Sequence, residues 1–377
     1  MQKKLLIPGP VELSKEVLQA MAEPVIGHRT PDFQEILEEC WGNLKDIFKT
    51  KNDVVLITGS GTAAMDAAIA STIGEGDEVV CITGGKFAER FAEIVKGYGG
   101  KARLVDVEWG SAADPKEVEK VVEESNAKAI TLTHNETSTG VLHNAKAIAE
   151  IAEKHDLLFI MDAITSIGGD YVEVDKWGVD ICIAGSQKCL AAPPGLAMLS
   201  VSDKAWKAIE SNETRNYYLN LASYRKALRK STTPFTPSVS LVYGLRAALR
   251  AVKKEGLEER IKRHRKLASA TREAVKALNL ELLPRDEDAS NTVTAIKAPP
   301  GVNADDIRKK MKEDFGILLA GGQATLKGKI FRIGHMGNIS YSDLTSALEA
   351  LEVTLKHLGH EVELGRGVKA AQKVFDS

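Results

Sequence analysis

A lysine and an aspartate that each follow an apolar segment are the residues of this sequence best suited to chemistry. Lys188 comes directly after the mostly apolar segment 179–184, and Asp162 ends another such segment, 157–162. Pyridoxal phosphate (PLP) chemistry needs this combination. The lysine forms a Schiff base with the aldehyde of the cofactor, and the aspartate keeps the pyridine nitrogen protonated, so that the ring can accept electrons from a substrate carbanion. The pair therefore predicts a PLP site.

A turn of small residues upstream supplies a third element of such a site. Ser60-Gly61-Thr62 lies between the apolar segment 54–57 and a segment with helical character. Such a turn presents free backbone N–H groups and the positive end of a helix to a phosphate. Taken alone the turn is a weak signal, because glycine serves many strand-to-helix turns. Its value comes from its combination with Lys188 and Asp162.

Both charged residues also have a purely structural interpretation. An arbitrary lysine is usually a solvated surface charge. The residues that follow Lys188, from 189 to 195, are small and apolar, and they would desolvate its amine and lower its pKa. Asp162 could instead be the N-cap of a helix that begins at Ala163. The end of an all-apolar strand seldom combines that role with cofactor binding.

Three further positions have residue types that suit a site. Arg332 interrupts an apolar strand, which is costly unless the guanidinium meets an anion, so it is a candidate clamp for a carboxylate. Phe87 is either a core aromatic or a ring that stacks on a cofactor. His134 and Glu136 are of metal-ligating types, but no second cluster has matching spacing, and we predict no metal.

Composition and charge limit the range of functions. The chain has 377 residues, with 50 lysines and arginines against 52 aspartates and glutamates, which gives a formal net charge of −2. This length corresponds to about two domains, and the charge offers no basic field for nucleic acid or an anionic membrane. The four cysteines have no metal-binding spacing, and no apolar run suits a signal peptide or a membrane span. We expect a cytoplasmic protein whose partners are small molecules.

The order of apolar and helical segments predicts the architecture. From about residue 53 to 202 short apolar segments alternate with helical ones, which indicates a mainly parallel sheet covered on both faces. Ligands of such sheets bind at the carboxyl ends of the strands, where the turn at 60–62, Asp162, the Lys188 loop and the segment 134–140 all lie.

The pattern changes near residue 240 to a long helical stretch that is broken near Gly256. After it we expect short strands at 280–283, 292–297 and 329–333 and a last helix at 342–358. The prediction is an α/β protein with an N-terminal extension (1–17), a large domain (18–255) and a smaller α+β C-terminal domain (256–377).

The sequence resembles the class V aminotransferases of PLP fold type I, and among them the alanine–glyoxylate, serine–glyoxylate and serine–pyruvate aminotransferases. The resemblance extends from Ile7-Pro8-Gly9-Pro10 to the strand around Arg332. Its most specific motifs are Gly185-Ser186-Gln187-Lys188 with the trailing Ala192-Pro193-Pro194-Gly195, His134-x-Glu136-x-Ser138-Thr139-Gly140, and Phe331-Arg332-Ile333-Gly334. It implies the type I fold, with a mainly parallel sheet in the large PLP-binding domain.

The resemblance also implies roles for individual residues. Lys188 would be the Schiff-base lysine, Asp162 the partner of the pyridine nitrogen, and Arg332 the clamp for the substrate carboxylate. Further cofactor contacts would come from Ser60, Gly61, Thr62 and Ser186 at the phosphate, Phe87 on the ring, Thr137 near the ring hydroxyl, and Gln187. The family is dimeric with shared sites, so Thr233 and Thr236 would reach the phosphate of the neighbouring chain. Relatives often carry tyrosine at position 233, and some carry tryptophan where this chain has Phe87.

We therefore expect a transaminase that works in two half-reactions, with alanine or serine as the amino donor and glyoxylate or pyruvate as the acceptor. Three alternatives stay open. A phosphoserine aminotransferase would need further cationic residues, which the sequence does not locate. A cysteine desulfurase or lyase usually has histidine before the lysine, where this chain has Gln187, and needs a mobile cysteine, whereas Cys189 lies on what should be a packed loop. A catalytically idle subunit of a complex would have no reason to bury a lysine, an aspartate and an arginine.

Overall fold

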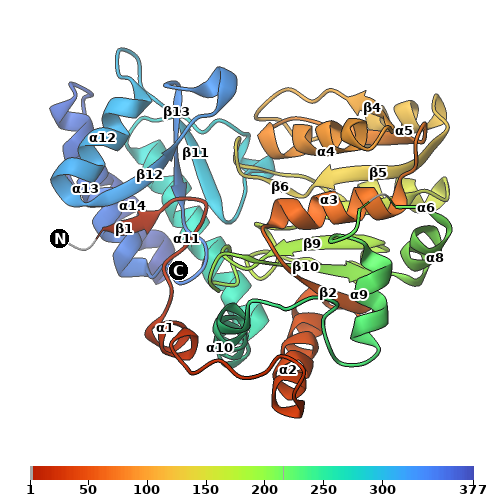
Figure 1. The fold of residues 1–377 in the computed structure, drawn as a ribbon. Coiled ribbons are helices and arrows are strands. Elements are labelled where there is room, and N and C mark those ends of the chain that lie inside the picture. The colour runs from red at the N-terminus through yellow and green to blue at the C-terminus, as the bar shows by residue number, and fades with distance from the viewer. Residues whose placement is uncertain (1–2, 215) are drawn as a thin grey trace.

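The computed structural model describes residues 3–214 and 216–377, which form a large α/β domain and a smaller α+β domain (Figure 1). The large domain is built on a seven-stranded sheet. Across the sheet the strands follow the order β2 (Asp53–Thr58), β10 (Leu196–Val201), β9 (Ile181–Gly185), β8 (Leu158–Asp162), β5 (Ala127–Thr133), β3 (Glu78–Ile82) and β4 (Lys101–Val105). All run parallel except β10, which is antiparallel to both β2 and β9. The predicted mainly parallel sheet is confirmed.

Helices cover both faces of this sheet, because successive side chains of each strand point to opposite faces and both sets are apolar. In β2, Val54 and Leu56 pack into the core on one face, and Val55 and Ile57 into the core on the other. The first face is covered by α1 (Lys15–Met21), α2 (Pro31–Phe48), α5 (Pro115–Glu123), α6 (Ala145–Lys154), α7 (Val174–Trp177) and α10 (Val239–Glu255). The second is covered by α3 (Gly61–Thr72), α4 (Lys86–Gly97), α8 (Asp203–Ser211) and α9 (Leu221–Leu228).

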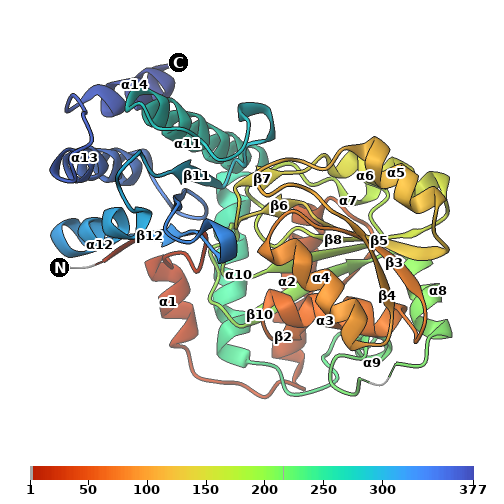
Figure 2. The same ribbon diagram turned by 90° about the horizontal axis from the view of Figure 1, so that it is seen from above.

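The smaller domain contains a four-stranded sheet with its own core, and Figure 2 shows it beside the large domain. Its strands are ordered β1 (Lys4–Leu6), β12 (Ile317–Gly321), β13 (Ile330–Gly334) and β11 (Val293–Lys297). Its helices are α11 (Leu257–Ala277), α12 (Ala304–Phe315), α13 (Tyr341–His357) and α14 (Arg366–Asp376), with short 3₁₀ turns at Asp286–Asp288 and Ala324–Leu326. The N-terminal extension thus contributes a strand to this sheet, since β1 pairs in parallel with β12.

Two details of this domain differ from the sequence-based expectation. Residues 280–283 do not form a regular strand; Leu282 makes only an isolated bridge to Ile296. The pairing stops there because Pro284 follows and has no N–H group to donate. The helix predicted at 342–358 is α13, but it is not the last one, because α14 follows it. No helix of the described ranges is both long and apolar enough to cross a membrane.

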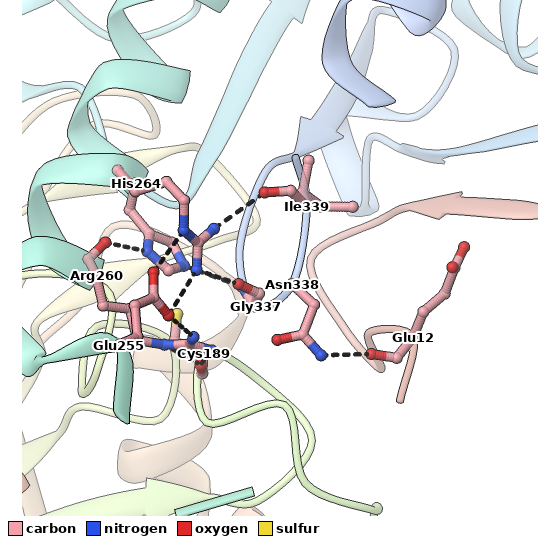
Figure 3. Close-up of polar contacts among 9 residues, drawn as sticks. Glu12, Cys189, Glu255, Arg260, His264, Gly337, Asn338 and Ile339 are labelled. Carbon is pink, nitrogen blue, oxygen red and sulfur yellow. Dashed lines mark hydrogen bonds and ion pairs between the residues drawn. The ribbon is translucent and has the colours of Figure 1, made fainter. Parts of the chain in front are cut away.

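A polar cluster joins the two domains next to Gly256, which separates α10 from α11 (Figure 3). Glu255 accepts hydrogen bonds from Arg260 and Arg263. The buried Arg260 also donates to the carbonyl oxygen of Cys189, at 2.6 Å from Nη2, and Arg263 donates to that of Gly337, at 2.9 Å. The cluster therefore ties the residue that follows the predicted catalytic lysine to the loop that follows β13.

Candidate active site

Most of the predicted site residues surround one cavity of about 110 Å³ at the carboxyl ends of β2, β5, β8 and β9. Parallel strands bring these ends to one edge of the sheet, as expected for this architecture. The cavity is lined by Ser60, Gly61, Thr62, Phe87, Arg90, Thr133, Asn135, Thr137, Asp162, Ile164, Thr165, Gln187 and Lys188.

Lys188 lies on the loop that follows β9, and its amine enters the cavity from there. Its Nζ donates a hydrogen bond to the carbonyl oxygen of Pro8, at 2.5 Å. Burial lowers the pKa of Lys188 from its usual value, because the charged ammonium loses its hydration. A larger fraction of the amine is then neutral, which is the form that attacks a carbonyl carbon.

Gly9 makes room for the Lys188 side chain. A Cβ at position 9 would lie 2.5 Å from Lys188 Cδ and 2.7 Å from Nζ, and the residue has a φ of +91°. We expect Gly9→Ala to displace the amine and to lower kcat roughly tenfold or more, because small misplacements of a reacting group are costly. Gly359→Ala is the matched control, since Gly359 has a similar φ of +85° but no atom within 4 Å of its Cβ position. Steady-state rates and Tm of both variants check this. Equal effects on kcat would show that backbone strain alone is responsible.

Asp162 is the last residue of β8, and its carboxyl group is only 4% exposed. Its Oδ1 accepts a hydrogen bond from the backbone N–H of Ile164, at 2.8 Å. No helix follows, because residues 163–170 form turns and a bridge, so the alternative role as a helix N-cap is wrong. Burial raises the pKa of Asp162 to about 7. A cationic N–H group in the cavity would restore the ionised carboxylate.

Three buried polar atoms around the cavity have no hydrogen-bond partner within the described residues: Thr133 Oγ1, Asn135 Oδ1 and Gln187 Oε1. Leaving such atoms unpaired costs about 1–3 kcal/mol each, so their presence together indicates a polar ligand. Ser60, the N-cap of α3, likewise makes no capping hydrogen bond with its side chain. Its hydroxyl and the first N–H groups of α3 are available to an anion.

The sequence did not identify Thr133 and Asn135 as site residues, and it also missed the roles of Arg90 and Glu136. Arg90 lines the cavity, donates to Thr62 Oγ1 at 2.9 Å and lies over the ring of Phe87, with 5.0 Å from Cζ to the ring centroid. The sequence did contain a signal for Arg90: it follows Phe87 by three residues, a spacing that places both side chains on one face of a helix. Glu136 accepts hydrogen bonds from the N–H groups of Phe87 and Ala88, at 3.0 and 2.9 Å. It therefore positions the start of α4 and the Phe87 ring.

Arg332 reaches the site from β13 of the smaller domain and is 5% exposed. Its Nε and Nη2 donate to the carbonyl oxygen of Gly321, at 3.0 and 2.6 Å, and its Nη1 donates to that of Thr137, at 2.6 Å. Two of the five N–H donors of the guanidinium are then left for a ligand. Burial lowers the pKa of Arg332 to about 10, so it stays cationic near neutral pH.

Four predicted residues lie outside the lining of this cavity: Arg332, which lines a neighbouring cavity, and the hydroxyl residues Ser186, Thr233 and Thr236. The hydroxyl of Ser186 donates to the carbonyl oxygen of Pro193, at 2.6 Å, and accepts from the N–H of Leu196. Thr233 Oγ1 donates to the carbonyl oxygen of Phe235, at 2.8 Å. In the single chain the hydroxyls of Ser186 and Thr233 hold backbone groups, and the proposed contacts of Ser186, Thr233 and Thr236 with a phosphate stay predictions.

The profile of the family described as Aminotransferase class-V matches residues 12–344. The chain belongs to the class V aminotransferases. An uncharacterised aminotransferase of Methanocaldococcus jannaschii is 49% identical over 99% of this chain and 98% of its own length. The soluble hydrogenase 42 kDa subunit of Anabaena cylindrica is 44% identical over the same shares of the two chains. The serine–glyoxylate aminotransferase of Arabidopsis thaliana is 35% identical over 97% of this chain and 94% of its own.

Among solved structures, ureidoglycine–glyoxylate aminotransferase from Bacillus subtilis superposes with a TM-score of 0.96 and 33% sequence identity. The match covers 100% of this chain and 99% of that one, which confirms the predicted PLP fold type I. As in other class V aminotransferases, the cofactor is pyridoxal phosphate.

The residues around the cavity fit this cofactor. Its phosphate would meet Ser60, Gly61 and Thr62 at the start of α3, and its protonated ring nitrogen would meet the buried carboxylate of Asp162. The unpaired oxygens of Thr133, Asn135 and Gln187 would accept or share hydrogen bonds with its polar substituents. When bound, the cofactor supplies an aldehyde for Lys188 and a ring that accepts electrons.

Proposed function

We propose that this aminotransferase transfers the amino group of alanine or serine to glyoxylate or pyruvate, in two half-reactions on one site. The observation that carries the proposal is that Arg332 and Lys188 line the same cavity, a second one of about 710 Å³ between the two domains. Each of these substrates has one α-carboxylate, which the guanidinium of Arg332 can bind, and one reacting carbon, which the amine of Lys188 can approach.

In this proposal each residue has a separate task. Arg332 binds and orients the α-carboxylate, so that the substrate Cα comes to the Nζ of Lys188. Lys188, which is largely buried and has a lowered pKa, takes the proton from Cα as general base and returns it as general acid. Asp162 holds a negative charge opposite the ring nitrogen, and Phe87 restricts the position of the ring from the side of α4.

The names of two relatives support glyoxylate as the acceptor. One is the serine–glyoxylate aminotransferase of Arabidopsis thaliana, and the other is the ureidoglycine–glyoxylate aminotransferase of Bacillus subtilis. The test is a panel of amino donors against glyoxylate and pyruvate, with the keto acid products quantified. Transfer from alanine or serine to either acceptor is expected. A panel without transfer from these two donors would refute the proposal.

Arg332→Ala should impair both half-reactions, because donor and acceptor both carry an α-carboxylate. The pair is charge-assisted and bidentate, so its loss should cost about 2–5 kcal/mol in kcat/KM, and Arg332→Lys should restore little, because lysine lacks the planar fork. Cofactor binding should stay unchanged. Single-turnover rates with alanine, and separately with glyoxylate on the aminated enzyme, check this. Full activity towards both acids would remove Arg332 from the substrate site.

The environment of Cys189 argues against the cysteine desulfurase alternative. Its side chain is fully buried, and its Sγ donates to the carbonyl oxygen of Thr165, at 3.2 Å. Burial raises the pKa of the thiol to about 12, so the nucleophilic thiolate is scarce near neutral pH. A desulfurase needs a mobile, reactive cysteine, and Cys189 is neither.

An idle subunit of a larger complex is the second candidate, and the name of the Anabaena cylindrica relative as a hydrogenase subunit favours it. The combination of a largely buried lysine, a buried aspartate and a buried arginine around one site favours the enzyme, since such groups are costly without a ligand. The donor panel separates the two candidates.

We further propose a cytoplasmic homodimer in which Thr233 and Thr236 complete the phosphate site of the partner chain. Light scattering on the purified protein tests the dimer. A monomer that binds the cofactor with full affinity would rule out shared sites.

A further inference from the structure

The larger cavity extends beyond the groups that alanine, serine or glyoxylate would use. It begins at Lys188, Phe87, Thr137 and Arg332 and continues to α12 of the smaller domain. Along α12 it is lined by the cationic Arg308, Lys309 and Lys312 and by the acidic Asp305 and Glu313. A three-carbon substrate that is bound by Arg332 would leave this part of the cavity unused.

Arg308 is held in a fixed orientation at this end. Its Nε donates to the carbonyl oxygen of Leu319, at 3.1 Å, and its Nη1 donates to Asp305 Oδ1, at 2.6 Å. The guanidinium also packs closely on Gly321, where a Cβ would lie 2.5 Å from Nη1 and 2.9 Å from Cζ. Its side chain is 35% exposed, and Nη2 has no hydrogen-bond partner among the described residues. A fixed guanidinium with free donors is suited to binding an anion.

Gly321 lies between this arginine and the predicted clamp. Arg332 donates two hydrogen bonds to the carbonyl oxygen of Gly321, while Arg308 packs on its Cα side. The charge of Arg308 reaches Arg332: burial lowers the pKa of Arg332 most, the negative charge of Glu136 raises it, and the positive charge of Arg308 lowers it further. Two guanidinium groups beside one glycine repel each other unless anions compensate them. Asp305 compensates Arg308 and Glu136 partly compensates Arg332, and the α-carboxylate of a substrate would add to the compensation of Arg332.

We propose that Arg308 binds a second anionic group, on the side chain of the substrate, and that the enzyme therefore also accepts amino acids with an acidic side chain and their 2-oxo acids. This inference rests on the proposed transamination, with the α-carboxylate on Arg332. The chemistry required of the side chain is a carboxylate or a phosphate monoester. Lys309 and Lys312 add positive charge along the same wall. These are cationic residues of the kind that a phosphorylated substrate would need, and the sequence alone did not place them near the site.

The test compares donors within one enzyme. With glyoxylate as acceptor, kcat/KM is measured for alanine, aspartate, glutamate and phosphoserine in the wild type, Arg308→Gln and Arg308→Lys. For at least one acidic donor, the ratio of its kcat/KM to that of alanine should fall about 30-fold in Arg308→Gln, as for loss of a charge-assisted hydrogen bond. Arg308→Lys should retain part of the ratio, because it keeps the charge without the fork. Inhibition by succinate relative to acetate provides a second readout, and the preference for succinate should fall in parallel.

Arg285→Gln is the matched control, because Arg285 also pairs with an aspartate three residues away, Asp288, but does not line the cavity. Its ratios should equal those of the wild type. A loss confined to aspartate and glutamate would identify a carboxylate as the second anion, and a loss confined to phosphoserine would identify a phosphate.

An equal loss for alanine and every acidic donor in Arg308→Gln, or unchanged ratios, would overturn the inference. So would a wild type that uses alanine but no acidic donor. Failure of the proposed function itself is a different result, because neither alanine nor serine would then transfer its amino group to glyoxylate or pyruvate.

Discussion

Lys188→Ala should abolish turnover and the borohydride-reducible bond between the cofactor and the protein. Among the residues that the structure describes, no other lysine lines the smaller cavity, so no other amine there is placed to bond the cofactor aldehyde. The wild-type protein should be yellow, and borohydride should bleach it and fix the cofactor to one lysine. Peptide mapping of the reduced protein then identifies the labelled residue.

The same experiment can also give results that would contradict the assignment of Lys188. A label on any lysine other than Lys188, or cofactor fixed by borohydride to a lysine of the Lys188→Ala variant, would refute the assignment. Lys309 and Lys312 line the larger cavity, so their peptides should be inspected for label as well. Added primary amines should restore some activity to Lys188→Ala, since they replace the missing proton acceptor, whereas they should not rescue a variant that is misfolded.

Asp162→Asn should retain the cofactor but lose roughly 10²–10³ in kcat, which is the usual cost of removing one preorganised electrostatic partner. The amide is nearly isosteric, so it keeps the acceptor for the N–H of Ile164 but cannot hold the ring nitrogen in its cationic form. Absorbance titration measures cofactor binding, and stopped-flow rates measure the half-reaction with alanine. A kcat close to that of the wild type would show that the ring nitrogen has another partner.

The raised pKa of Asp162 also predicts how the stability of the cofactor-free protein depends on pH. In the folded state the pKa is about 7, above the ordinary value of 3.8 that applies to the unfolded chain. The folded state therefore binds the extra proton between these values, and this group's contribution to the free energy of unfolding falls as pH rises from about 4 to 7. Asparagine does not ionise, so Asp162→Asn should not lose this free energy of unfolding as pH rises. The variant should therefore be more stable than the wild type at pH 8 and not at pH 4. Denaturant titrations at both pH values check this. If the free energies of unfolding of the variant and the wild type differ equally at pH 4 and pH 8, the raised pKa of Asp162 is contradicted.

Local sequence was sufficient for the parts of the site that follow single strands. Lys188 and Asp162 could be recognised because continuous apolar segments form buried parallel strands, and the first polar residue after such a strand lies at the ligand-binding edge. Arg332 could be recognised for a related reason, since a charge inside an apolar strand needs a partner. In these cases residues close together in the chain carried the whole signal.

Strand pairing and helix orientation were decided only by the tertiary structure. The sequence pattern did not show that β1 joins the sheet of the smaller domain or that β10 runs antiparallel, because the partner of a strand depends on residues far away in the chain. For the same reason Glu136 did not stand out as a support for Phe87, 49 residues before it. Arg308 is one charged residue among several on an amphipathic helix, and only the packing of α12 on Gly321 brings its guanidinium to the cavity.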